Sequence, residues 1–166
     1  MSNLRLINET TFSSVNTVNV TDVFSADFDI YKITFDDGGQ YGNLRFLNSA
    51  GSVMTDSKYD TARHNLILNS SFTETRVTDQ SVGIFAFTES SSADGGGNVL
   101  YIFNPFSSSC YTFVIAQTVD ISTSTNHRIA KAIGVHKNLG SMSGFQLNAQ
   151  AGVDGTLRTY GLRVDS

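Results

Sequence analysis

The chain has 166 residues, with 11 basic and 15 acidic side chains and a formal net charge of −4. This balance, without a cluster of Lys and Arg, excludes electrostatic binding of nucleic acid, and apolar runs of about four residues are too short for a membrane helix of roughly 20 residues. A single cysteine, Cys110, excludes an intramolecular disulfide and a cysteine-based zinc site.

The composition and the apolar pattern favour strands. Ser, Thr and Asn number 51, whereas the strong helix formers Glu and Lys number only 3 and 4. Apolar residues recur at every second position, which is the period of a strand with two different faces. In chain order, the first predicted strands cover 17–24, 30–35 and 44–47.

The stretch 52–78 is the least regular part of the chain. Residues 58–67 within it can hold one short helical turn. We expect most of the stretch to be a long crossing loop with one strand inside it.

Alternation is clearer in the second half of the chain. Asp154-Gly155 is the favoured pair for a hairpin turn, which predicts a chain reversal within 152–155. The predicted strands here cover 82–87, 99–103, 111–121, 128–136, 145–149 and 157–164, with a polar loop at 89–98.

Nine or ten short strands separated by turns at intervals of about 8–14 residues predict an all-β fold. We expect an antiparallel β-sandwich, jelly-roll-like, with about 8–10 strands. Residues 13–166 form one sandwich domain in this prediction, and residues 1–12 form an N-terminal arm or an edge strand. Aromatic residues occur on both faces of many strands, as expected of a sandwich that also packs against neighbouring subunits.

Four apolar residues near the N-terminus are candidate contact residues, namely Leu4, Leu6, Ile7 and Phe12. They lie in a polar stretch before the first clear strand. The segment can be a plain edge strand or an arm that reaches onto a neighbouring subunit or a shell, and the sequence leaves both alternatives open.

No constellation of residues indicates catalysis or metal binding. The histidines His64, His127 and His136 lack metal-ligand spacing, and in one continuous strand the last two, nine positions apart, would point to opposite faces about 30 Å apart. The chain has no Gly-x-Ser-x-Gly nucleophile elbow and no Cys–His catalytic signature. We therefore expect a protein that is not an enzyme and that uses no metal and no cofactor.

An acidic cluster is formed by Asp27, Asp29, Asp36 and Asp37. Oxygen-rich loops can bind Ca²⁺, but the EF-hand pattern with its glycine and distal glutamate is missing. Solvated aspartates in turns are the preferred interpretation.

Exposed loop residues offer an alternative contact site. Tyr41 belongs to a predicted loop at 36–43, Asp94 belongs to the loop at 89–98, and Tyr101 is a further exposed candidate. Tyrosine rings can stack on sugar rings. The preferred interpretation is that the aromatic residues fill the sandwich core or a subunit interface.

Two stretches at the ends of the chain resemble a known family. Residues 14–33 read Ser-Val-Asn-Thr-Val-Asn-Val-Thr-Asp-Val-Phe-Ser-Ala-Asp-Phe-Asp-Ile-Tyr-Lys-Ile. The second stretch combines Ser-Gly-Phe-Gln-Leu at 143–147 with Gly-Thr-Leu-Arg-Thr-Tyr-Gly-Leu at 155–162. They are similar to the opening and the ending of small virion structural proteins of tailed bacteriophages, of the marine and cyanophage type. The middle of the chain does not share this resemblance.

The resemblance implies a jelly-roll-like sandwich that assembles as a symmetric homo-oligomer, expected to be a homotrimer, and it carries over no catalytic or binding residue. The leading hypothesis is a capsid decoration (cement) protein that binds the major capsid protein, is synthesised in the host cytoplasm and localises to the virion. The alternative is a tail fibre or baseplate-associated module that recognises a host surface glycan.

Overall fold

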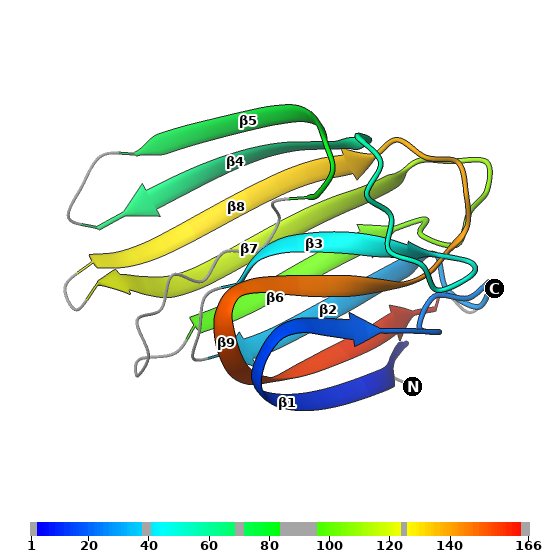
Figure 1. The fold of residues 1–166 in the computed structure, drawn as a ribbon, viewed down its shortest axis with the longest axis horizontal. Coiled ribbons are helices and arrows are strands. Elements are labelled where there is room, and N and C mark those ends of the chain that lie inside the picture. The colour runs from blue at the N-terminus through cyan, green and yellow to red at the C-terminus, as the bar shows by residue number, and fades with distance from the viewer. Residues whose placement is uncertain (1–2, 38–40, 69–71, 84–95, 124–125, 164–166) are drawn as a thin grey trace.

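The computed structural model describes residues 3–37, 41–68, 72–83, 96–123 and 126–163, and these residues form strands and their connections (Figure 1). The strands are β1 (Leu4–Val20), β2 (Ile30–Asp37), β3 (Tyr41–Asn48), β4 (Tyr59–Ile67), β5 (Thr73–Gln80), β6 (Gly96–Phe103), β7 (Thr112–Thr123), β8 (Asn126–His136) and β9 (Met142–Leu162). No helix among them is long and apolar enough to cross a membrane.

The strands form one antiparallel sheet that curls into two layers. Its order is β1-β9-β2-β6-β7-β8-β4-β5, and β3 pairs with β9 outside this path. The first half of β9 pairs with β3 and with the end of β1, whereas its second half pairs with β2 and with the start of β1. The two long strands β1 and β9 therefore pass from a smaller layer into a larger one, and β3 and the first half of β9 lie over the larger layer (Figure 1). The predicted all-β, antiparallel, sandwich-like fold is confirmed.

The hydrophobic core lies between the two layers. Alternate residues of β2, β3, β6, β7 and of parts of the other strands except β5 point into it, as the period of two requires. Phe24 and Tyr31 meet edge to face at a centroid distance of 4.7 Å, and Phe46 stacks with Tyr59 at 6.1 Å. The largest fully buried side chains are Tyr31, Tyr59, Phe46, Phe145, Ile33, Leu44, Leu47, Leu100, Ile102 and Met142.

The predicted helical turn and crossing loop within 52–78 are wrong. Residues 59–67 and 73–80 form the antiparallel pair of strands β4 and β5. Thr61 and Asn65 occupy the buried face of β4, where an apolar residue is usual. Because the buried positions are polar, the hydrophobic alternation that reveals a strand is weak in this stretch.

The predicted hairpin turn at 152–155 is also wrong, because β9 runs through it as one strand of 21 residues. A Cβ atom at Gly155 would collide with the carbonyl oxygen of Asp36 and lie 3.1 Å from the ring of Phe12. Glycine at this position lets neighbouring backbone and an aromatic ring approach β9 closely, so it serves packing and not a chain reversal.

The predicted N-terminal arm is placed in the first half of β1, paired with the second half of β9 at the end of the sheet. Ile7 and Phe12 pack against the core, whereas Leu4 and Leu6 remain 37% and 49% exposed. The sequence analysis did not identify this segment as a clear strand, because its side chains are largely polar.

The predicted strand at 82–87 and the loop at 89–98 fall mostly outside the described residues. Gly83 bridges to Leu44 of β3 through two backbone hydrogen bonds of 2.9 and 3.0 Å. Strand β6 begins at Gly96, three residues before the predicted start of its strand.

Candidate interaction surface

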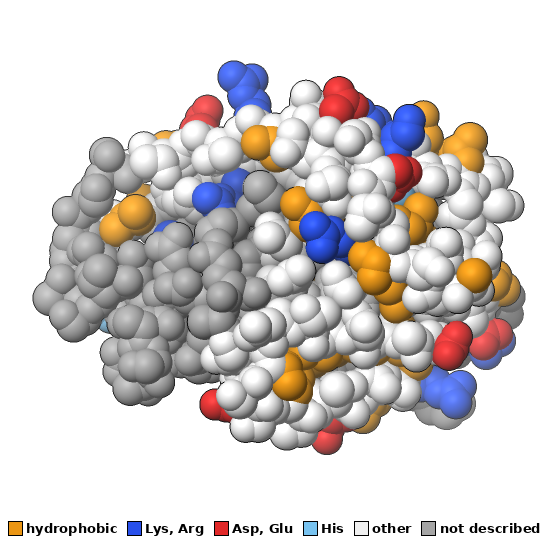
Figure 2. Space-filling model, viewed as in Figure 1, with side chains coloured by type: hydrophobic (Ala, Val, Ile, Leu, Met, Phe, Trp, Pro, Cys, Tyr) orange, Lys and Arg blue, Asp and Glu red, His pale blue; other side chains and the backbone are white. Residues whose placement is uncertain are grey.

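The outer side of the smaller layer follows the usual rule of polar residues outward. Arg45, Gln146 and Asn19 lie side by side on β3, β9 and β1. The Gln146 amide donates a hydrogen bond of 2.9 Å to Asn19 Oδ1. Figure 2 looks onto this layer, and the apolar side chains in the view are scattered among polar side chains and backbone.

The outer side of the larger layer departs from this rule. On β7, Val114 and Ala116 point into the core, but the alternate residues Phe113 and Ile115 are also apolar and are 47% and 44% exposed. On β8, Ala130 and Ala132 are buried, whereas Ile133 is 61% exposed. Both faces of these strands are therefore apolar, and within the described part of the chain only one of them is covered.

The strand register gathers these outward residues into one surface. Ile115 of β7 is paired with Tyr101 of β6 on one side and with Ile133 of β8 on the other. Ile133 is in turn paired with Ala62 of β4. We call this surface the outer apolar face; it consists of Ala62, Leu66, Tyr101, Phe103, Phe113, Ile115, Val119, Ile129, Ile133 and Val135.

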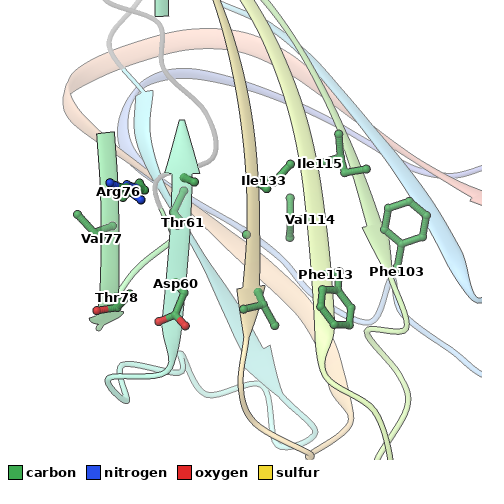
Figure 3. Close-up of a pocket in the computed structure, with 13 residues that line it drawn as sticks. Asp60, Thr61, Arg76, Val77, Thr78, Phe103, Phe113, Val114, Ile115 and Ile133 are labelled. Carbon is green, nitrogen blue, oxygen red and sulfur yellow. The ribbon is translucent and has the colours of Figure 1, made fainter. Parts of the chain in front are cut away.

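The outer apolar face is hollowed. A hollow of about 470 Å³ extends across β6, β7, β8, β4 and β5. Figure 3 shows Phe103, Phe113 and Ile115 on one side of it, with Asp60 and Thr78 on the other. A second hollow of about 340 Å³ lies further along β6 and β7 and reaches β9 at Arg158. The lining is dominated by hydrocarbon, which suits apolar contact more than hydrogen-bonded recognition.

An ion cluster lies beside the first hollow, where β4, β5 and β8 meet. The ammonium of Lys137 is 2.7 Å from Asp79 Oδ1 and 3.0 Å from Asp60 Oδ2. A hydrogen bond from the backbone N–H of Asp79, followed by that of Lys137, lowers the pKa of Asp60. The carboxylates of Asp79 and Asp60 raise the pKa of Lys137. The ammonium and the two carboxylates neutralise one another, and they link the end of β5 to β4 and to the residue that follows β8.

The predicted loop contacts are placed differently by the structure. Tyr101 is not in a loop; it lies in β6, on the outer apolar face, because it alternates with the buried Leu100 and Ile102. Tyr41 begins β3 in the other layer, where its backbone pairs with β9. The side chain of Tyr41 and the whole of Asp94 lie outside the described part of the structure.

The residues at the centre of the outer apolar face were not singled out from the sequence. The consecutive apolar residues from Phe113 to Ala116 were the available signal, because a strand with one solvated face alternates and this one does not. Such a run is equally expected of a strand that its own chain buries on both faces. The covering layer decides between the two cases.

The histidines behave as ordinary structural residues. His136 is fully buried, with Nε2 3.2 Å from Asp56 Oδ1 and its ring 4.2 Å from that of Tyr59. Burial lowers the pKa of His136, and the hydrogen bond to the Asp56 carboxylate offsets only part of this effect. His127 is exposed, so the two histidines of β8 lie on opposite faces as predicted. No group of three potential metal ligands exists among the described residues.

Two of the acidic residues near β2 accept hydrogen bonds, Asp27 within a turn and Asp36 across the sheet from β9. Asp27 accepts a hydrogen bond of 3.3 Å from the Ser25 hydroxyl, and Asp36 accepts one of 3.3 Å from the backbone N–H of Thr156. Asp29 is exposed, and the Asp37 side chain lies outside the described part. These observations match solvated aspartates that shape local backbone.

Comparison with known proteins does not assign the chain to a family. No protein-family model matches the chain, and no curated protein matches it. Among solved structures, an alginate lyase Aly36B mutant in complex with alginate tetrasaccharide aligns over 100% of both chains with 8% identity and a TM-score of 0.29. The marine PL-14 alginate lyase from Aplysia kurodai aligns over 92% of this chain and 80% of that one, with 7% identity and a TM-score of 0.28. At these scores the similarity carries no argument about fold or activity.

Proposed function

We propose that this protein is a non-enzymatic structural protein that acts by binding other protein surfaces, as a capsid decoration protein of a tailed bacteriophage. The observation that carries the proposal is the outer apolar face on β6, β7, β8 and β4. The resemblance of the two chain ends to phage virion proteins supports the location on a virion.

Protein–protein contact fits the chemistry of this face. The largest apolar patch on a typical monomer covers about 300–600 Å², and larger patches mark interaction sites. Here Ile115, Ile133, Val119 and Ile129 supply branched hydrocarbon, with few hydrogen-bonding groups among them. A decoration protein binds only the assembled shell, so its binding energy stabilises that state by mass action.

The alternative is a receptor-binding module at the tail or baseplate that recognises a host surface glycan. The observation in its favour is Tyr101, an exposed ring on the same face next to Phe103 and Phe113. Sugar stacking needs such rings, but it also needs hydrogen-bonding groups around them. The aliphatic majority of the face therefore favours the protein partner.

Immunogold electron microscopy of particles purified from infected cells tests the location. We expect gold label over the capsid, in many copies for each particle. Label confined to the tail supports the receptor-binding alternative, and unlabelled particles overturn the virion proposal.

Rebinding of recombinant protein to particles stripped of it tests the face. We expect Ile133→Lys to abolish co-sedimentation with the particles. Leu139→Lys is the matched control, because Leu139 is 52% exposed in the connection after β8 and lies outside the outer apolar face. Equal loss with both variants contradicts a role of this face in binding.

A further inference from the structure

The outward residues of β7 and β8 repeat the same pattern along the two strands. The register pairs Phe113 with Val135, Ile115 with Ile133, Gln117 with Lys131, and Val119 with Ile129. Each strand thus presents two apolar residues, one polar residue and a further apolar residue, and like residues lie side by side. The surface is quasi-symmetric about the line between β7 and β8.

Such a surface can complement itself. A twofold axis along that line, in the plane of contact, carries β7 of one copy over β8 of the other and keeps each pair at the same level along the strands. Ile115 then faces Ile133 of the second copy, and the reverse contact is made at the same time. This is the isologous arrangement that twofold dimers require.

We propose that two copies of this chain pack face to face through the outer apolar face, as a twofold dimer with its axis between β7 and β8. The inference rests on the proposed function, because the dimer formed through the outer apolar face is then the unit that binds the shell, while the face itself is covered by the second copy. It differs from the homotrimer that the leading hypothesis from the sequence expects.

The neighbouring strands fit the same axis. It places Tyr101 of β6 over Ala62 of β4 of the second copy, so a large side chain meets a small one. It also places the ammonium of Lys131 opposite Gln117 of the second copy, whose side-chain oxygen can accept a hydrogen bond. On β7 and β8 the polar level therefore meets a polar level, and on the outer strands the ring of Phe103 lies over Asp60 of the second copy, whose carboxylate is paired with Lys137.

The available area suits a stable dimer. The strands β2, β6, β7, β8, β4 and β5 lie side by side. Four strands at about 4.8 Å and seven residues at about 3.4 Å give roughly 460 Å² for the outer apolar face itself, and the flanking strands β2 and β5 extend the footprint to roughly 700 Å², close to the roughly 800 Å² for each partner in a standard interface. Aligned packing of two such sheets is the arrangement found inside β-sandwiches.

Analytical ultracentrifugation of the purified full chain tests the oligomeric state. We expect a dimer whose dissociation constant rises roughly 100-fold in Ile133→Lys, because each dimer contains two copies of the altered contact. Leu6→Lys is the control, since Leu6 is exposed on β1, away from the face. A monomer or a trimer in the wild type overturns the proposal, and so does dissociation by Leu6→Lys, which would indicate contact through the N-terminal strand.

Thiol cross-linking tests the axis, with Cys110, which is exposed, replaced by Ser in every chain. Strands β6 and β4 are three strand spacings apart, so residue 101 lies about 14 Å sideways from its own copy across the proposed axis. A short cross-linker should join Tyr101→Cys chains to Ala62→Cys chains in a mixture and neither variant to itself. Self-linking of Tyr101→Cys overturns this axis. Circular dichroism of each variant verifies that it is folded.

The two proposals fail separately. A wild type that is monomeric in solution, but loses particle binding on Ile133→Lys, overturns the dimer and leaves the proposed function standing. A wild type that is dimeric in solution but absent from virions overturns the proposed function and leaves the dimer standing.

Discussion

At the end of β8, the buried imidazole of His136 makes the stability of the fold depend on pH. Burial lowers its pKa from the ordinary 6.5, so the unfolded chain binds a proton more readily than the folded one. The free energy of unfolding should therefore fall as the pH drops through about 6.5, by at most about 1.4 kcal/mol per pH unit for one proton.

Urea unfolding at a series of pH values measures this dependence. His136→Asn should remove most of the slope between pH 7 and pH 5.5, whereas the control His127→Asn should keep it, since His127 is exposed. An unchanged slope in His136→Asn would show that another group carries the dependence.

Gly144 is a position where only a hydrogen atom fits. A Cβ atom there would collide with the backbone oxygen of Val20 in β1 and lie 3.1 Å from the Cα of Thr21. We expect Gly144→Ala to lower the free energy of unfolding by about 1–3 kcal/mol, as overpacking typically does. Gly97→Ala is the control, because its added Cβ meets only a side-chain methyl group of Val119, at 3.6 Å. Thermal unfolding of both variants compares them, and equal melting temperatures would contradict the steric argument.

At the scale of elements, β4 is tied to the smaller layer by one side chain. The Tyr59 hydroxyl accepts a hydrogen bond of 2.9 Å from the backbone N–H of Phe46 and donates one of 3.2 Å to the carbonyl of Met54. Tyr59→Phe leaves the buried N–H of Phe46 without this acceptor, which costs about 1–3 kcal/mol. Chemical denaturation should show this loss, and amide hydrogen exchange should show it concentrated in β3. A loss spread evenly over all strands would contradict the local tie.

The strands were predictable where apolar, β-branched and aromatic residues are concentrated between turn-forming residues. The predictions at 30–35, 99–103, 111–121 and 128–136 correspond to β2, β6, β7 and β8. They failed in β4, whose buried side includes polar residues, and in β9, whose glycines resemble a turn. In both cases the residue type is explained by contact with a strand that is distant in the sequence, and a local sequence pattern carries no information about that contact.

At the scale of the whole molecule, the larger layer has one covered and one uncovered apolar face. Val114 and Ile115 are consecutive on β7 and point to opposite faces; Val114 is buried and Ile115 is exposed. Val114→Ala should cost about 1–3 kcal/mol of unfolding free energy, because it leaves a cavity in the core. Ile115→Ala should change the unfolding free energy by about 0.5 kcal/mol or less at protein concentrations below dimer formation. Denaturation of dilute protein compares the two, and a large loss in Ile115→Ala would mean that the outer face is covered within one chain.

The sequence predicted the kind of candidate site, a surface for contact with neighbouring subunits, but not most of the residues that form it. Aromatic residues on both faces of the strands indicated contact with neighbouring subunits, and Tyr101 was chosen individually. Ile115 and Ile133 were not chosen, because an apolar residue in a strand does not reveal which side another layer covers. The register of β6, β7, β8 and β4 brings these residues together from separate parts of the chain.

The strand-rich composition and the low charge can be read from the amino acids alone, and so can the side of a strand on which a residue lies, because alternation is a property of the local backbone. The bending of β1 and β9 through both layers, and the covering of one face of β6, β7 and β8 by the smaller layer, are features of the folded chain. Those outcomes depend on pairings such as Leu4 with Leu162, between residues at opposite ends of the chain. Which apolar surface is buried and which remains open for a partner follows from those distant pairings.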